Sequence, residues 1–336
     1  MVVRSADVFY IMSKNIIHVN NWAILGGMES MIIDFARTFP MFQHILCTTH
    51  PEREDYDFIE YIRNLGIKYV QGTVNRDLLD QFDPFVIFLH NTKGEFIEGE
   101  YPYDWLKRTN VVGMHHAATF PLVPAEMDYF VSKIIRKKYD NCMSRIKNSI
   151  SAPPCVHAED YMKIYKERGE RLVVGRIQSQ TCGDTNNEMM DVFNKIDNVE
   201  YVIVTKNPKP DTDRFTYLPI KPGKMPEYLS KIDVFAMWSN RPETWSRVTT
   251  EAMLSSIPVI VFNRNDGLAE QVSESNCGLL VNTPEAFKTA IELFRDNESL
   301  RQYYRNSKKW AYTNASDYTL KKIFSDKFLE WSLDAI

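Results

Sequence analysis

The sequence contains few cysteines and no closely spaced pair of them. Its 336 residues include five cysteines, which are widely separated and form no C-x-x-C motif: Cys47, Cys142, Cys155, Cys182 and Cys277. This pattern is typical neither of a disulfide-linked scaffold nor of a structural zinc site. We therefore expect free thiols in a reducing compartment, which favours a cytoplasmic protein.

Long apolar segments are also missing. The longest apolar runs, such as Ile257–Phe262, are far shorter than the ~20 residues that a membrane-spanning helix needs. The N-terminal sequence MVVRSADVFY has no uninterrupted apolar stretch and no signal-peptide cleavage site. With 44% hydrophobic and 25% charged residues and a formal net charge of −4, the composition is that of a soluble globular protein. The charge argues against a surface that binds nucleic acid throughout.

Glycine is sparse, and the 13 glycines include no G-x-G-x-x-G motif. The pair Gly26-Gly27 has no third glycine in register, so a dinucleotide cofactor is not indicated and we expect no cofactor. The pair nevertheless follows a predicted strand and opens a predicted helix. Such glycines let the backbone approach a ligand, and a helix N-terminus favours an anion. The same pair is equally common in an ordinary tight turn.

Short β-branched runs alternate with segments of helical period along the whole chain, which is typical of βαβ units and parallel sheets. In the first half we predict strands at Asn15–Val19, His44–Thr48, Lys68–Val70, Pro84–Leu89 and Asn110–Met114, with helices at Glu29–Thr38 and Asp55–Leu65. A second cycle has predicted strands at Arg171–Val174, Val199–Val204, Val234–Met237 and Pro258–Phe262. Its predicted helices are Asn187–Lys195, Met225–Leu229, Ser246–Ser255, Pro284–Arg295 and most of the C-terminal region.

Between the two cycles lies Ser149–His157, which contains Pro153-Pro154 and is a candidate interdomain linker. We therefore predict an α/β protein with a Rossmann-like domain at 1–150 and a second at 151–336. About the last 25 residues are expected to return to the first domain. Two facing domains of this kind would hold a ligand in a cleft at the carboxyl ends of their sheets.

The segment Arg241–Leu254 is the most informative stretch of the chain. Glu243 precedes its predicted helix and Glu251 lies inside the helix, which places the two carboxylates roughly 10 Å apart along the axis. That separation suits a ligand with two polyhydroxyl ends and a diphosphate between them, because the helix N-terminus favours phosphate and carboxylates accept hydrogen bonds from hydroxyls. Two ordinary exposed glutamates at a helix start would give the same pattern.

The wider context resembles the donor domain of the retaining glycosyltransferases of family 4, which have the GT-B fold. The resemblance covers Leu229–Val281 most specifically: the E-x7-E motif of Glu243 and Glu251, Ile257-Pro-Val-Ile, Gly267-Leu-Ala-Glu270 and Asn276-Cys-Gly-Leu-Leu. More loosely, Asn15–Glu29 is similar to the family's first strand and turn, and Leu172-Val-Val-Gly-Arg176 to its phosphate-arginine strand. His90 and His115 stand where the family has strand-end histidines.

The resemblance implies that the N-terminal domain (1–150) binds the acceptor and that the C-terminal domain (151–336) binds the sugar-nucleotide donor. It also implies a role for each matching position. Glu251 would hold the nucleotide ribose, Glu243 the transferred sugar and Arg176 the diphosphate, while His115 would contact the transferred sugar. The backbone at Gly26 and Gly27 would meet the phosphate or the acceptor. The turn of Thr244, Trp245 and Ser246 would offer its N–H groups to the phosphate. The co-substrate implied is a nucleoside-diphosphate sugar, with no metal ion.

Two positions depart from the family pattern. Cys182 stands where a lysine usually partners the phosphate arginine, so Lys206 or Arg247 would have to supply the second cation. Ser246 replaces a usual glycine, which is a milder change because serine is a good N-cap.

Three further features have a plain alternative explanation. Of the adjacent His115 and His116, only one can face a ligand, because neighbouring strand residues point to opposite sides. Asp211-Thr-Asp213 resembles a metal-binding DxD motif, but its Pro- and Lys-rich surroundings indicate a solvated turn. The basic residues Lys133, Arg136, Lys137 and Lys138 favour either an anionic surface or a simple solvated helix face.

These observations favour a retaining glycosyltransferase whose acceptor is a lipid-linked or small-molecule glycan or a modified DNA base. Two alternatives stay open: a sugar-nucleotide epimerase or hydrolase of the same fold, and a catalytically weak protein that binds sugar nucleotides. Turnover of donor without acceptor would separate the first alternative from a transferase.

Overall fold

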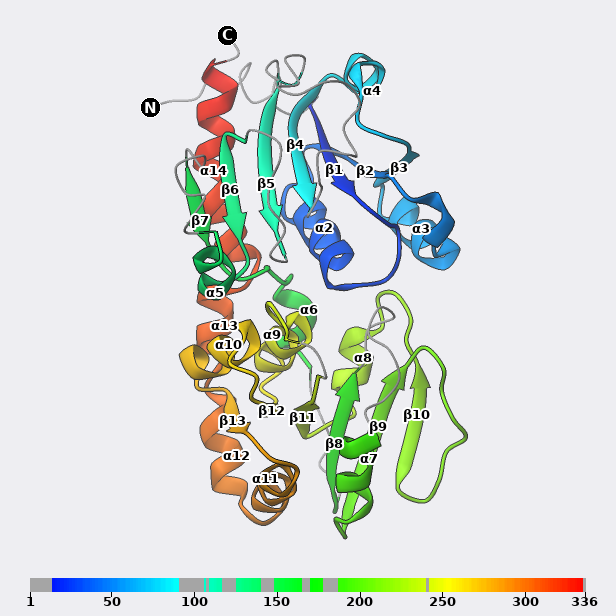
Figure 1. The fold of residues 1–336 in the computed structure, drawn as a ribbon, viewed down its shortest axis with the longest axis vertical. Helices are drawn as coiled ribbons and strands as arrows, with labels where there is room; N and C mark the ends of the chain where they lie inside the picture. The colour runs from blue at the N-terminus through cyan, green and yellow to red at the C-terminus, as the bar shows by residue number, and fades with distance from the viewer. Residues whose placement is uncertain are drawn as a thin grey trace. The chain divides into compact units, whose positions relative to one another are not determined.

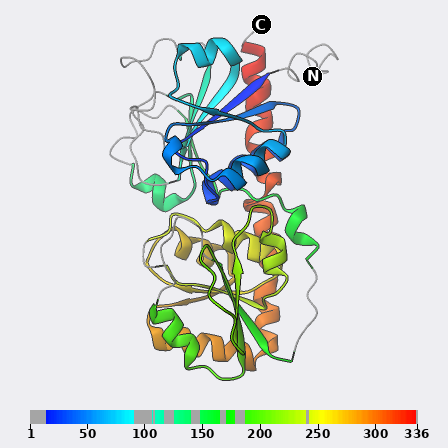
Figure 2. The same ribbon diagram turned by 90° about the vertical axis from the view of Figure 1, so that its right-hand side faces the viewer.

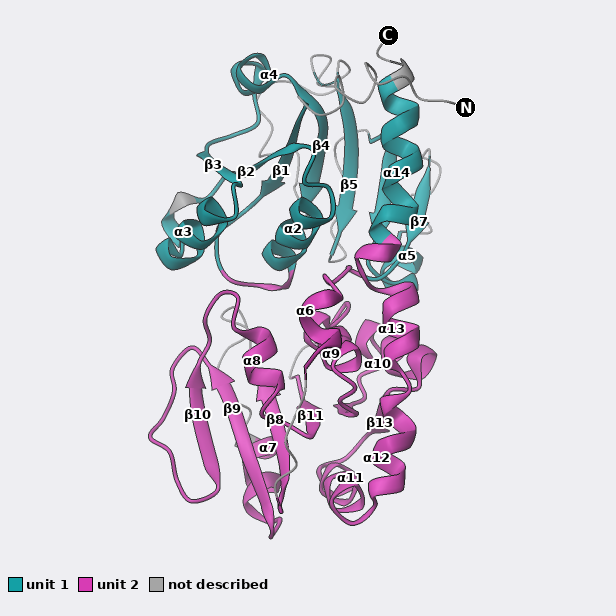
Figure 3. Cartoon of the chain, turned by 180° about the vertical axis from the view of Figure 1, so that it is seen from behind, with its two compact units in different colours: residues 1–24, 28–153, 320–336 teal, residues 25–27, 154–319 magenta. Residues whose placement is uncertain are grey.

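The computed structural model describes residues 14–90, 106, 109–116, 125–139, 148–164, 170–177, 187–239 and 242–334. The chain divides into two compact units (Figure 3). The N-terminal unit comprises 1–24, 28–153 and 320–336, and the C-terminal unit comprises 25–27 and 154–319. The main division therefore falls between Pro153 and Pro154, inside the predicted linker.

The N-terminal unit contains a parallel seven-stranded sheet in the order β3-β2-β1-β4-β5-β6-β7 (Figure 1). Its strands are β1 (Asn15–Asn20), β2 (Gln43–Thr48), β3 (Lys68–Gln71), β4 (Pro84–His90), β5 (Asn110–His115), β6 (Met127–Phe130) and β7 (Ser149–Ser151). The chain reverses direction across the sheet between β1 and β4, since β2 and β3 lie on one side of this pair and β5 to β7 on the other. Ligands of parallel α/β sheets bind at such a switch point, outside the carboxyl ends of the strands.

The helices of this unit are α2 (Gly27–Thr38), the 3-10 turn η1 (Pro51–Arg53), α3 (Tyr56–Asn64), α4 (Arg76–Phe82), α5 (Lys133–Lys137) and most of α14 (Asp317–Asp334). Their ends follow local chemistry. Asp55 and Asn75 accept hydrogen bonds from the third backbone N–H of α3 and α4, respectively. Gly66, just past α3, has a φ of +80°, the left-handed conformation with which helices commonly end.

An aromatic cluster ties the C-terminal helix α14 to this unit. Phe324 lies 5.2 Å from Phe35 of α2 and 5.5 Å from Phe88 of β4, and Phe328 lies 5.1 Å from Phe39, measured between ring centroids. All five rings are buried. Burial of large aromatic side chains contributes strongly to stability, so the end of the chain is an integral part of the N-terminal core.

The C-terminal unit contains a parallel six-stranded sheet in the order β10-β9-β8-β11-β12-β13. Its strands are β8 (Leu172–Ile177), β9 (Val199–Thr205), β10 (Phe215–Pro219), β11 (Val234–Met237), β12 (Val259–Phe262) and β13 (Gly278–Val281). Its helices are α6 (Glu159–Met162), α7 (Asn187–Asn194), α8 (Met225–Leu229), α9 (Arg247–Leu254), α10 (Gly267–Ser275), α11 (Pro284–Asp296), α12 (Glu298–Arg305) and α13 (Lys308–Asn314).

Two separate hydrophobic cores lie on the two faces of this sheet, which helices cover on both sides (Figure 2). One core includes Leu254, Ile257 and Leu268 from the segments around α9 and α10, and the other includes Phe193 of α7 and Phe287 of α11. The switch point of this sheet is the neighbouring pair β8 and β11. Within the described residues, no helix is both long and apolar enough to cross a membrane.

Candidate active site

Arg176 and Glu243 flank the switch point of the C-terminal sheet. Arg176 lies near the end of β8, where its side chain is buried and its Nη1 is 3.0 Å from Sδ of Met237 at the end of β11. Glu243 follows β11 and is partly exposed. Burial raises the pKa of the Glu243 carboxyl, while a hydrogen bond from Ser239 and the charge of Arg176 oppose that rise. A carboxylate and a cation therefore meet at the edge of the sheet where ligands are expected.

Helix α10 holds the loop that carries Glu243. The N–H of Glu243 donates to Oδ2 of Asp266 at 2.7 Å, and the carbonyl of Glu243 accepts from the N–H of Gly267 at 2.9 Å. Oδ1 of Asp266 caps α10 by accepting from the N–H of Ala269. A Cβ on Gly267 would stand 1.6 Å from the carbonyl oxygen of Thr244, so only glycine allows this close approach.

Gln271 fixes the turn into α9. Its side-chain amide pairs with the backbone of Ser246: Oε1 accepts from the Ser246 N–H at 3.2 Å, and Nε2 donates to the Ser246 carbonyl at 3.1 Å. Nε2 also lies 2.9 Å from Oγ1 of Thr250, and Ser246 caps α9 through the N–H of Thr249. The Ser246 N–H is thus engaged within the protein, and Ser246 shapes the turn rather than offering that N–H to a phosphate.

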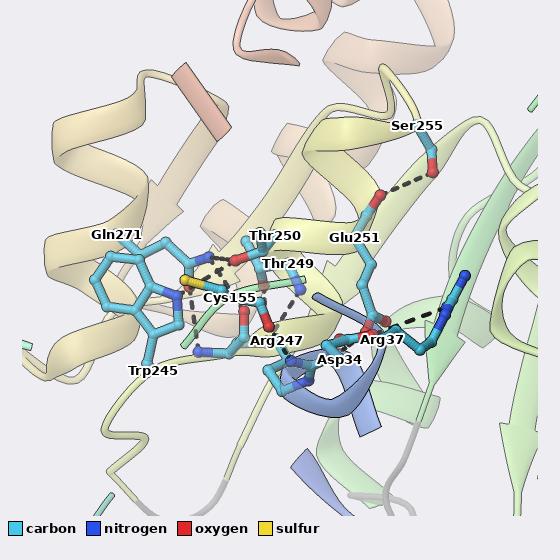
Figure 4. A network of polar contacts seen from close by, with 11 residues as sticks. Asp34, Arg37, Cys155, Trp245, Arg247, Thr249, Thr250, Glu251, Ser255 and Gln271 are labelled. Atoms are coloured by element: carbon cyan, nitrogen blue, oxygen red, sulfur yellow. Dashed lines mark hydrogen bonds and ion pairs between the residues drawn. The ribbon is translucent and has the colours of Figure 1, made fainter. Parts of the chain in front are cut away.

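Arg247 and Glu251 form a buried ion pair on α9 (Figure 4). Nη2 of Arg247 lies 3.4 Å from Oε1 of Glu251, and the two residues are 7% and 4% exposed. The guanidinium of Arg247 also donates to the carbonyl of Cys155. The carboxylate expected to hold a ribose is therefore positioned by a cation one helical turn earlier.

Trp245 and Lys206 occupy different surroundings. The indole of Trp245 is buried, its Nε1 donates to Oγ1 of Thr250 at 3.3 Å, and its ring stacks 6.4 Å from Trp310. Its side chain thus packs within the unit. Lys206 directly follows β9, the strand beside β8, and is exposed. Among the described residues, Lys206 is thus a cation at the carboxyl end of β9.

His115, the last residue of β5, belongs to the N-terminal unit. Its Nε2 lies 2.7 Å from Oδ1 of Asp128 on β6, and both residues are buried. The ring also stacks on Phe130 at 4.7 Å. Gly113 leaves room for this pair, because a Cβ there would lie 2.6 Å from Oδ1 of Asp128. The structure therefore holds His115 in one orientation through a carboxylate partner.

The remaining predicted positions are distributed as follows. Gly27 begins α2, and Gly26 precedes it; both are grouped with the C-terminal unit, where a Cβ on Gly27 would stand 3.6 Å from Cδ of Arg247. Cys182 and Arg241 lie outside the described residues. Within the C-terminal unit the structure thus brings Arg176 and Glu243 together at the switch point, and Glu251 lies on the helix that follows.

Neither a metal centre nor a DxD site emerges from the described part of the chain. No group of three or more His, Cys, Asp or Glu side chains there is arranged to hold a metal ion. Asp211 accepts a hydrogen bond from the N–H of Tyr217 at 2.7 Å, which is the behaviour of a structural turn. The basic residues of and after α5 are exposed: Lys133, Arg136, Lys137 and Lys138.

Comparison with known proteins agrees with this geometry. The family model for "Glycosyl transferases group 1" matches residues 212–310, which contain Glu243, α9 and α10. No curated protein matches the sequence significantly.

Several solved structures share the fold. Anabaena HepE in complex with UDP-glucose is 15% identical, with a TM-score of 0.71 over 94% of this chain and 99% of that one. The sucrose-phosphate synthase of Thermosynechococcus elongatus is 13% identical (TM-score 0.66; 94% and 100% covered). WaaG, a glycosyltransferase of lipopolysaccharide biosynthesis, is 10% identical (TM-score 0.66; 93% and 99% covered). At these identities the likeness establishes the fold, which is GT-B. The family match supports a glycosyltransferase.

Three residues that support the predicted positions were not among the predicted site residues. Asp266, Gln271 and Asp128 contact site residues through space but stand 13 to 25 positions away in the chain. Asp266 carries a local signal, since an aspartate directly before Gly267 and a helical segment is typical of an N-cap. Gln271 carries none, because its two bonds to Ser246 depend on how α10 packs beside α9.

Proposed function

We propose that this chain is a retaining, metal-independent glycosyltransferase that moves a sugar from a nucleoside-diphosphate sugar to an acceptor hydroxyl. The observation that carries the proposal is the pair of Arg176 and Glu243 at the β8–β11 switch point. Arg176 supplies a buried positive charge, and Glu243 supplies a partly exposed carboxylate on a loop fixed by Asp266 and Gly267. A diphosphate needs the first group, and sugar hydroxyls need the second.

The reaction would use these groups in the following way. The bond between the sugar carbon and the donor phosphate breaks while the acceptor oxygen bonds to the same face of the sugar. The acceptor proton passes to the departing phosphate oxygen. Arg176 offsets the negative charge that develops on the diphosphate, and Glu243 orients the sugar through its hydroxyls. Glu251, held by Arg247, would accept hydrogen bonds from the ribose.

The first donor to test is UDP-glucose, because the HepE structure of the same fold holds UDP-glucose. A ligand that binds only the folded state raises the melting temperature by mass action. We expect UDP-glucose, GDP-glucose or ADP-glucose to raise the melting temperature, and Glu243→Gln to abolish transfer while the fold stays intact. Glu274→Gln, which changes an exposed glutamate on α10, is the matched control.

Four outcomes would contradict the proposal or a part of it. Full transfer activity in Glu243→Gln would remove the site assignment. Consumption of the donor without any acceptor, measured by product analysis, would indicate a hydrolase or an epimerase instead. Binding of donor without turnover against any acceptor would indicate a sugar-nucleotide-binding protein. Loss of activity on treatment with a chelator would contradict metal independence.

The acceptor is proposed only by class. The exposed cations Lys133, Arg136, Lys137 and Lys138 favour an anionic acceptor or surface near α5, such as a lipid-linked glycan in a membrane with acidic headgroups. Cosedimentation with vesicles of acidic phospholipid, compared with neutral vesicles, tests this contact. Equal binding to both would exclude it.

A further inference from the structure

β10 is an edge strand of the C-terminal sheet and pairs in parallel with β9. In such a strand every second residue directs its backbone N–H and carbonyl outward, where they offer a template to another chain. The carbonyl of Arg214 accepts from the N–H of Tyr201, and the N–H of Ile220 donates to the carbonyl of Thr205, both on β9. The even-numbered residues therefore face β9. The outward residues of β10 are Phe215, Tyr217 and Pro219.

Each outward position of β10 lacks a backbone N–H that another strand could use. The N–H of Phe215 donates to Oγ1 of Thr212 at 3.1 Å, and the N–H of Tyr217 donates to Oδ1 of Asp211 at 2.7 Å. Pro219 has no N–H. Thr212 also donates its own N–H to the carbonyl of Phe215 at 2.9 Å. Asp211 and Thr212 thus make three hydrogen bonds to the outer side of the strand.

The connection from β9 to β10 brings these two residues to the strand edge. Its nine residues, 206–214, are all described and contain no helix or strand, although parallel strands are usually joined by a longer crossover that includes a helix. The connection instead runs back along the outer side of β10 (Figure 1). Pro208 and Pro210 favour an extended backbone for themselves and for the residues before them. An extended segment can follow the length of the strand and bond to it.

The strand itself is well suited to pairing. Its sequence Phe-Thr-Tyr-Leu-Pro is rich in side chains that favour strands. The ring of Phe215 stacks on that of Tyr201 at 4.9 Å, and both belong to one core of the unit. Tyr217 packs against the same core, and Leu218 packs against the core on the other face of the sheet. Packing on both faces therefore holds β10 in the sheet independently of the bonds at its outer edge.

We propose that Asp211 and Thr212 form an edge cap, which prevents β10 from pairing with the β10 strand of a second copy of this chain. Exposed edge strands are sites of association between protein chains, and soluble proteins cover or block them. The edge cap gives a role to the Asp211-Thr-Asp213 segment, whose sequence resembles a DxD motif. Neither Asp211 nor Thr212 belongs to the proposed donor site, so the edge cap does not depend on the proposed function.

The outward residues define how two uncapped strands would meet. Two copies of β10 would pair antiparallel about a two-fold axis, the commonest symmetry of protein dimers. With Thr216 opposite Thr216 of the second copy, Phe215 of each copy lies opposite Tyr217 of the other. Both are outward residues, so each of these two pairs can exchange two backbone hydrogen bonds. The two Thr216 residues then form the closer, non-hydrogen-bonded pair, with Cα atoms about 4.5 Å apart.

Thr216→Cys detects this pairing, because that Cα separation lies within the range of a disulfide bond. Thr216 is exposed. The substitution is introduced into the native chain and into Asp211→Ala/Thr212→Pro, which removes all three bonds of the edge cap. The matched control is Asp211→Asn/Thr212→Ser, which keeps both acceptor oxygens and the backbone N–H. Asp213→Ala, which removes a neighbouring exposed carboxylate, controls for the loss of charge.

The full-length variants are incubated with oxidised glutathione as the oxidant and separated by electrophoresis without reductant. Each is compared with the same background that has threonine at position 216. We expect Asp211→Ala/Thr212→Pro to raise the fraction of dimer linked through position 216 at least about tenfold, the effect of roughly one hydrogen bond. The matched control and Asp213→Ala should keep the fraction found in the native background. Light scattering should show an increase in mass for the uncapped variant with threonine at position 216.

Equal cross-linking in the uncapped variant and its matched control, or none in either, overturns the edge cap. Association of the uncapped variant without a disulfide at position 216 overturns the proposed pairing. Cross-linking of Asp213→Ala to the level of the uncapped variant would show that charge, rather than hydrogen bonding, protects the strand. If the proline variant does not fold, Asp211→Ala/Thr212→Val removes both side-chain acceptors with the Thr212 N–H kept, and the same outcomes decide the question.

Discussion

Nη2 of Arg247 lies 3.4 Å from Oε1 of Glu251, one helical turn away on α9, and both side chains are almost completely buried. A charge in such a place is costly unless it is paired, since the protein interior solvates ions poorly. The pair consequently makes each residue depend on the other. It also keeps the Glu251 carboxylate buried inside the C-terminal unit, in addition to the Glu243 carboxylate at the switch point.

We predict that Arg247→Met destabilises the protein by about 3 kcal/mol, because it leaves the Glu251 carboxylate buried without its cation. Lys288→Met is the matched control. Lys288 and Glu292 have the same i, i+4 spacing at 3.3 Å but are partly exposed to solvent, so the loss of this pair should cost less than about 0.5 kcal/mol. Urea denaturation measures both. Adding Glu251→Gln to Arg247→Met should recover part of the loss, and a double variant that is simply additive would contradict coupling.

The second prediction concerns the contact between α10 and the Glu243 loop. A Cβ on Gly267 would stand 1.6 Å from the carbonyl oxygen of Thr244, and that backbone cannot move without breaking the bond between the Gly267 N–H and Glu243. We expect Gly267→Ala to destabilise the protein by at least about 2 kcal/mol, the scale of overpacking, and to weaken donor binding. Gly27→Ala, whose Cβ meets only a side chain at 3.6 Å, should keep wild-type stability. Equal melting temperatures for the two variants would count against this account.

Much of the fold could be predicted from the sequence where strands are buried on both faces. The predicted strand at Pro84–Leu89 is β4, with every residue of β4 buried, and Val234–Met237 coincides with β11. Such strands form continuous apolar runs between turn residues. β10 was missed because it is a short edge strand with only its first residue buried, and a solvent-exposed edge needs no apolar run.

The missed strand β6 shows the other limit. Its sequence Met127–Phe130 contains Asp128, which looks like a polar interruption. In the structure that aspartate is buried because His115 on β5 satisfies it at 2.7 Å. The site follows the same rule. The glutamates of Arg241–Leu254 were found from their spacing in the chain, whereas the role of Gln271 depends on a contact between distant segments.

The third prediction concerns the space around the His115–Asp128 pair. Gly113→Ala would place a methyl group 2.6 Å from Oδ1 of Asp128 and 3.0 Å from Nε2 of His115. We expect the two side chains to separate, with a loss of about 1–3 kcal/mol from overpacking and broken bonding. Asp128→Asn keeps the volume and removes only the charge, so it should retain more stability than Gly113→Ala. Melting temperatures from calorimetry rank the two variants. A lower melting temperature for Asp128→Asn than for Gly113→Ala would show that the charge of Asp128 contributes more to stability than the space beside Gly113.

The fourth prediction concerns the change in the free energy of unfolding as the pH falls. Native His18, His44 and His90 stay neutral because burial lowers the pKa of each, whereas in the unfolded chain they take up protons near pH 6.5. The unfolded state then binds more protons than the native state. The three histidines therefore lower the free energy of unfolding by about 4 kcal/mol as the pH falls from roughly 7.5 to 5.5. Glu29 acts in the opposite direction. Burial raises its pKa to about 7, so the native state takes up a proton over the same interval and regains about 2 kcal/mol.

The histidines and Glu29 change the free energy of unfolding in opposite directions as the pH falls, so a substitution of Glu29 separates the two contributions. The native protein should lose about 2 kcal/mol of unfolding free energy between roughly pH 7.5 and 5.5, the difference between the histidine and glutamate contributions. Glu29→Gln removes the compensating carboxyl. It keeps a side-chain oxygen that can accept from Nδ2 of Asn20, which lies 2.8 Å from Oε1 of Glu29 in the native protein. Its loss over the same interval should therefore rise to about 4 kcal/mol. Urea titrations at the two pH values measure both slopes. Equal sensitivity to acid in the two proteins would mean that native Glu29 takes up no proton between these pH values, which would contradict the raised pKa.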